Sequence, residues 1–88
     1  MVIVMPTVIF TAHLKRVAPG RVNVEGATVR AALENVFAGY AGLDGYILDD
    51  QKRLRRHVAL FVNGDRARLD DPVEPNAEIA VMQALSGG

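Results

Sequence analysis

Residues 78–88 read Glu78-Ile79-Ala80-Val81-Met82-Gln83-Ala84-Leu85-Ser86-Gly87-Gly88, and the rest of the sequence is best understood from them. The first half predicts a strand, because Ile79 and Val81 are β-branched and their side chains point to the same face. The closing Gly87 and Gly88 would add little stability to a fold, since glycine has no side chain to pack and is the residue most costly to order. We therefore expect a strand followed by a slender, flexible tail over residues 85–88. The alternative is an ordinary frayed terminus without a role.

The composition indicates one small domain that includes all residues, 1–88. Ten acidic and ten basic side chains cancel, which argues against a nucleic-acid binder. The absence of cysteine excludes disulfides, thiolate metal sites and a cysteine nucleophile. The apolar opening residues are too few to span a membrane and lack a preceding basic segment, so a cytoplasmic protein is expected.

The first third of the sequence predicts two strands. Residues 2–10 are rich in β-branched side chains, with a break at Pro6, which cannot donate a hydrogen bond to a neighbouring strand. Pro19-Gly20 is a turn signal, and residues 21–25 alternate polar and apolar side chains, as a half-buried antiparallel strand does. A hairpin is therefore expected.

A helix is predicted after Thr28, a good N-cap residue. Apolar residues recur at helical spacing and form one stripe, which predicts a helix lying on a sheet. The stripe consists of Val29, Ala32, Leu33, Val36, Phe37 and Tyr40.

The second half predicts a crossover and further strands. Residues 41–54 contain turn signals, apolar anchors at Leu43, Ile47 and Leu48, and an expected short helical turn. Residues 57–62 form a strand pattern, and Asn63-Gly64 is a strong hairpin signal, because both turn positions need a positive φ. The chain would return through residues 66–69, and Asn76 could adopt a left-handed turn conformation before the last strand.

The resulting order, β-β-α-β-β-β, predicts an α+β fold with one main helix on one face of a mixed sheet. The opposite face would then expose a flat apolar patch beside the tail. It comprises Ala59, Phe61, Ala80, Met82 and Ala84. This patch is either a docking surface or simply an exposed sheet face without a partner.

The segments 57–65, 76–81 and 85–88 together resemble the ubiquitin-like sulfur carriers of the MoaD/ThiS family. The early segment 5–10 and the basic residues Arg55-Arg56-His57 are most similar to the CysO-type branch. Two features depart from the family pattern: Asn76-Ala77 replaces the usual Gly-Asp, and the proline often found near Gln83 is missing.

This resemblance implies a β-grasp domain with four or five strands that is a carrier and not an enzyme, so no residue of its own would be catalytic. An E1-like adenylyltransferase and sulfurtransferase would adenylate Gly88 and convert it to a thiocarboxylate, and a sulfur-accepting synthase would consume the sulfur. Gly87 would permit close passage, and Leu85 with Ser86 would direct the tail. ATP and Mg²⁺ would belong to the activating partner, with no cofactor or metal, nucleic acid or membrane bound by this chain.

Several alternatives stay open at this point. The sulfur could serve the biosynthesis of cysteine, molybdopterin, thiamine or a secondary metabolite, and the chain could be a molybdopterin synthase small subunit. It could also be a ubiquitin-like protein modifier or a non-catalytic interaction module. The basic run 52–57 could meet an acidic partner or a phosphate, although a solvated loop is the simpler interpretation.

Overall fold

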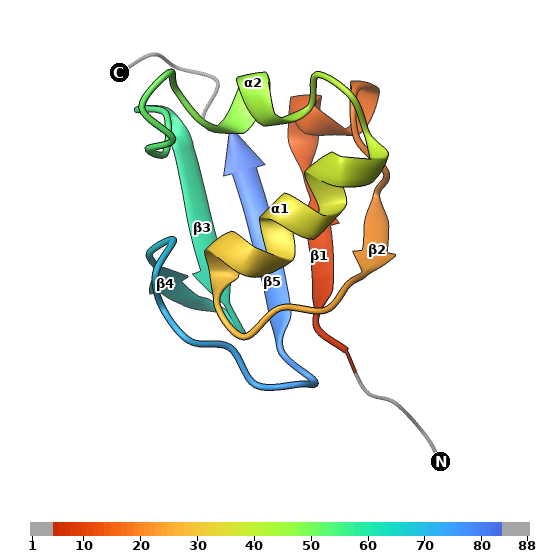
Figure 1. Cartoon of the computed structure of the whole chain (residues 1–88), viewed down its shortest axis with the longest axis vertical. Coiled ribbons are helices and arrows are strands. Elements are labelled where there is room, and N and C mark those ends of the chain that lie inside the picture. The colour runs from red at the N-terminus through yellow and green to blue at the C-terminus, as the bar shows by residue number, and fades with distance from the viewer. Residues whose placement is uncertain (1–4, 84–88) are drawn as a thin grey trace.

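The computed structural model describes residues 5–83, and these form a five-stranded mixed sheet with one main helix across one face (Figure 1). The predicted α+β fold is confirmed. The strands are β1 (Thr7–Phe10), β2 (Arg21–Asn23), β3 (Val58–Val62), β4 (Asp65–Ala67) and β5 (Glu78–Gln83). Their order in the sheet is β2-β1-β5-β3-β4. The central β5 runs parallel to β1 and antiparallel to β3.

The helix α1 (Val29–Gly39) begins as the sequence predicts, because the Thr28 hydroxyl accepts a hydrogen bond of 3.1 Å from the backbone N–H of Ala31. The stripe buries Val29, Ala32, Leu33 and Val36 against the sheet. Phe37 is only partly buried, and Tyr40 is the residue after the helix, with 40% of its surface exposed. The apolar stripe is thus one turn shorter than its spacing predicts.

The sheet contributes alternate residues to the core that it shares with α1. These are Val8 and Phe10 of β1, Val58 and Leu60 of β3, and Ile79 and Val81 of β5. The short helix α2 (Asp44–Ile47) closes one end of this core, where the predicted anchors Leu43, Ile47 and Leu48 are all buried. The expected crossover with a helical turn is confirmed.

Three local expectations need correction. The connection between β1 and β2 contains a 3₁₀ helix, η1 (Ala12–Arg16), which the sequence pattern did not predict. Strand β2 ends at Asn23, two residues early, although the backbone N–H of Val24 still donates to the carbonyl of Pro6 at 3.0 Å. Asn76 does not adopt the left-handed conformation, which occurs instead at Lys52 and, as predicted, at Asn63. The part of the first predicted strand that precedes Met5 lies outside the described residues.

Candidate docking face and tail exit

The central strand β5 is the last element before the predicted tail in the sequence. Its last residue, Gln83, is paired with Val58, the first residue of β3. The predicted tail, Leu85, Ser86, Gly87 and Gly88, follows in the sequence and lies outside the described residues, as does Ala84 of the predicted patch. Within the described residues β5 ends at Gln83, and we call this end of the strand the tail exit.

The face of the sheet opposite α1 is open, and four of the predicted patch residues lie on it. Ala80 pairs with Phe61, and Met82 pairs with Ala59. Residues directly opposite one another in a ladder share a face, so the four side chains form a square two strands wide. Met82 is 43% exposed, and the other three are partly buried.

Register adds residues that the sequence analysis missed. Ile9 of β1 pairs with Ala80 on one side and with Arg21 of β2 on the other, while Phe61 pairs with Arg66 of β4. A row thus crosses all five strands, with three apolar residues at its centre and a guanidinium at each end. Only the pairing of β1 with β5 reveals it, and no local pattern encodes that pairing.

The open face changes from polar to apolar along β5. At the start of the strand, Glu78 forms an ion pair of 3.6 Å with Arg21, and Asn23 donates a hydrogen bond of 3.1 Å to the hydroxyl of Thr7. At the other end, Met82 lies beside the tail exit. We call Ile9, Ala59, Phe61, Ala80 and Met82 the open-face patch. Its apolar end is therefore the end from which the chain continues.

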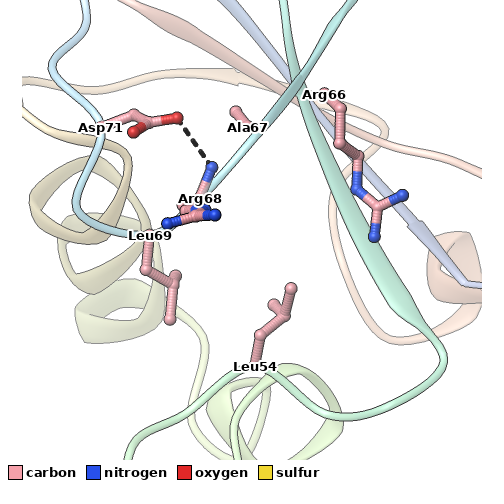
Figure 2. A pocket seen from close by; sticks show the side chains of 6 residues that line it. All are labelled: Leu54, Arg66, Ala67, Arg68, Leu69 and Asp71. Atoms are coloured by element: carbon pink, nitrogen blue, oxygen red, sulfur yellow. Dashed lines mark hydrogen bonds between the residues drawn. The ribbon is translucent and has the colours of Figure 1, made fainter.

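A hollow lies beside β4. It is lined by Leu54, Arg66, Ala67, Arg68, Leu69 and Asp71. Figure 2 shows Leu54 and Leu69 extending toward each other from opposite sides of it. The carboxylate of Asp71 accepts a hydrogen bond of 2.9 Å from the backbone N–H of Arg68 and so stabilises the turn. This arrangement contains no nucleophile beside a base, and its polar groups serve the loop itself.

Within residues 5–83, no three histidine or carboxylate side chains gather as metal ligands would. None of the helices there has the length and apolar character needed to cross a membrane.

Known structures share this architecture. The crystal structure of SAMP1 from Haloferax volcanii superposes with a TM-score of 0.80 at 30% identity, covering 94% of this chain and 98% of that one. CysO in the Amycolatopsis orientalis BexX/CysO complex gives a TM-score of 0.83 at 22% identity, covering 94% and 99% of the two chains. In sequence, small archaeal modifier protein 1 of Haloferax volcanii is 32% identical over 69 residues, which are 77% of this chain and 79% of that protein.

A mixed five-stranded sheet with one helix across it and an open apolar face defines a β-grasp domain of the ubiquitin-like class, which includes small modifiers and sulfur carriers. The sequence model of the ThiS family matches residues 8–88, nearly the whole chain. The protein belongs to the ThiS family, whose members are small carriers and modifiers and not catalysts. The resemblance to the MoaD/ThiS family is thereby confirmed, and the CysO structure shows the shared fold.

Proposed function

We propose that this protein is a sulfur carrier whose Gly88 carboxylate is adenylated by an E1-like, ATP-dependent enzyme and then converted to a thiocarboxylate. The observation that carries the proposal is the match to the ThiS family, which extends through Gly88. The direction of β5 supports it, because the central strand of the sheet leads toward that residue past an open apolar face.

The chemistry explains why a partner is needed. A terminal carboxylate has a pKa of about 3.3–3.7, so at neutral pH it is ionised and a poor acyl donor. Attack of its oxygen on the α-phosphorus of ATP forms an acyl adenylate and releases pyrophosphate. A sulfur nucleophile then attacks the carbonyl carbon, and AMP leaves. Mg²⁺ and the cationic groups that stabilise such a transition state would come from the activating enzyme.

The open-face patch is the docking surface in this proposal. Aromatic and methionine side chains are common anchors of protein interfaces, and Phe61 and Met82 lie on the open face next to the tail exit. A partner that covers them would hold the base of the tail in place. Leu85 and Ser86 would direct the tail, and Gly87 would let it pass through a narrow channel, since glycine lacks a Cβ atom.

The recipient would be a sulfur-accepting synthase in the cytoplasm, in cysteine biosynthesis or a related pathway such as molybdopterin formation. Specificity among such synthases depends on docking contacts with each one. The test is intact-mass analysis after incubation with the activating enzyme of the same organism, ATP, Mg²⁺ and a sulfur donor. The expected product is heavier by the difference between sulfur and oxygen, and a variant lacking Gly88 should not form it. An unchanged mass, with an enzyme preparation that is active on another ThiS-family carrier, would contradict the proposal.

A second candidate is a protein modifier that becomes joined to lysine side chains. It is favoured by the 32% identity to a protein named small archaeal modifier protein 1. The same adenylate would then be attacked by an amine instead of a sulfur nucleophile. Digestion of host proteins followed by peptide mass spectrometry should reveal lysines carrying a Gly-Gly remnant, and such remnants should disappear when the gene is deleted.

A further inference from the structure

The tail exit lies between two pairs of exposed cations that come from distant parts of the chain. Lys15 and Arg16 belong to η1, and Arg55 and Arg56 precede β3. We call these four residues the cationic collar. None of them forms an ion pair with a residue in the range 5–83.

The topology places both pairs at the same end of the sheet. Because β1 and β5 are parallel, with Phe10 paired with Val81, the chain enters η1 level with the end of β5, and the backbone N–H of Thr11 donates to the carbonyl of Val81 at 3.1 Å. On the other side, Val58 pairs with Gln83, so Arg55 and Arg56 lie just beyond that pair. Figure 1 shows η1 and the segment before β3 at the end of the molecule toward which β5 points.

The segment that carries Arg55 is fixed in place. Its backbone N–H donates to Ile47 at 2.9 Å, and its Nε donates to the carbonyl of Gly45 at 2.7 Å. Asp49 forms its ion pair with Arg53 and also attracts Arg55, whose charge contributes to the lowered pKa of Asp49. Asp44 at the start of α2 and Asp50 in the loop that follows are the other carboxylates between α1 and Arg55.

The opposite end of the sheet has the opposite sign. Glu25 follows β2, Asp65 follows the β3–β4 turn, and Glu74 and Glu78 lie at the start of β5. The formal net charge of the whole chain is zero. Arg66 and Arg68 also lie near this end, and Asp44, Asp49 and Asp50 lie near the other. The charges are therefore partly separated along the sheet, and the positive end of the resulting dipole is at the tail exit.

We infer that the enzyme that receives the tail presents an acidic surface around the mouth of its channel, and that the cationic collar docks on it. This inference rests on the proposed function. A protein that accepts the tail must approach the collar, because the two pairs flank the base of the tail. Four cations brought against a neutral or basic surface would lose water without gaining a partner, whereas carboxylates would compensate them and accelerate encounter. A molecule without net charge would then be oriented tail first by its dipole.

The test compares two double variants that remove equal charge. R16Q/R56Q takes one cation from each pair, and R30Q/R68Q takes two cations from the start of α1 and the loop that packs against it, outside the collar. The readout is pyrophosphate release by the activating enzyme of the same organism, measured as kcat and kcat/KM for the carrier. Sodium chloride is varied between about 20 and 500 mM, over which the screening length falls from roughly 20 to 4 Å.

We expect R16Q/R56Q to lower kcat/KM about five- to tenfold at low salt, with kcat unchanged and with a weaker salt dependence than wild type. R30Q/R68Q should stay within about twofold of wild type, and R16K/R56K, which keeps the charges, should match wild type. Equal losses in the two glutamine variants, or no loss in R16Q/R56Q, would overturn the inference while pyrophosphate release by wild type upheld the adenylation step of the proposed function. A wild-type protein that released no pyrophosphate would instead refute the proposed function itself, and this inference with it.

Discussion

Arg66 and Phe61 are direct partners across β3 and β4, and the guanidinium carbon of Arg66 lies 5.9 Å from the centroid of the Phe61 ring. A guanidinium at this distance is attracted to the ring by about 0.5–1 kcal/mol at an exposed site. Arg66 therefore borders the open-face patch and helps to orient its one aromatic side chain. The neighbour of Phe61, Leu60, lies on the other face of the same strand. Alanine variants of Phe61 and Leu60 therefore distinguish an effect on docking from an effect on folding.

Replacing Phe61 by alanine should weaken docking much more than folding. Phe61 is only partly buried on the open face, whereas Leu60 is fully buried under α1. We expect Phe61→Ala to raise the KM for the activating enzyme about tenfold, as loss of an interface anchor does. Leu60→Ala should cost about 2–5 kcal/mol of unfolding free energy. Urea denaturation and steady-state kinetics of both variants measure this, and a Phe61→Ala protein with unchanged KM would count against the docking surface.

Gly26 is needed because another backbone segment passes next to it. A Cβ atom there would clash with the backbone nitrogen of Ala32 and would lie 2.6 Å from its Cα, in the first turns of α1. Backbone cannot move aside as a flexible side chain can, so Gly26→Ala should destabilise the protein by about 1–3 kcal/mol.

Gly20 provides the matched control for this substitution. It has no atom within 4 Å of an added Cβ, and its φ is not positive. Gly20→Ala should therefore be neutral or stabilise by up to about 1 kcal/mol, through the reduced entropy of the unfolded chain. The prediction for Gly26 fails if the two variants have the same midpoint in urea.

The sequence predicts well those elements whose signals are local. Thr28 and the spacing after it identify α1, and Asn63-Gly64 identifies the turn between β3 and β4, where φ is 50° and 90°. The alternation in β5 correctly divides the core residues Ile79 and Val81 from the exposed Met82. In each case the physical cause lies within a few residues of the feature.

Features that depend on distant pairing were not predictable in this way. The 3₁₀ helix η1 is fixed by the contact between Thr11 and Val81, and the contribution of Ile9 to the open face depends on its register with Ala80. Asn63 also accepts a hydrogen bond of 2.9 Å from the backbone of Glu78, which links the hairpin turn to the start of β5. The cationic collar has the same origin, because 39 positions separate Arg16 and Arg55 in the sequence.

The cap of α1 offers a direct measure of local stabilisation. Thr28→Ala removes the acceptor for the backbone N–H of Ala31 and should lower the unfolding free energy by about 0.5–2 kcal/mol. Thr28→Ser keeps the hydroxyl and should lose much less. Urea midpoints with unchanged m-values are the measurement, and equal losses in the two variants would mean that the hydroxyl bond is not the cause.

Asp49 should make the stability of the protein depend on acid pH. Its carboxylate accepts hydrogen bonds of 2.9 Å from the backbone N–H groups of Arg53 and Gln51, and the Arg53 bond is the main reason that its pKa is lowered from 3.8, against the opposing effect of burial. A lowered pKa means that the folded protein favours the ionised form. This stabilisation is complete above the unfolded-state pKa and is lost as the pH falls through the lower folded-state pKa. Asp49→Asn should therefore be less stable than wild type at pH 7, and the difference should shrink as the pH drops below 3.8.

Urea denaturation between neutral and strongly acid pH tests this, with Asp50→Asn as an exposed control expected to stay within about 0.5 kcal/mol of wild type at pH 7. A gap between Asp49→Asn and wild type that stayed constant across that range would show that the carboxylate acts without regard to its charge.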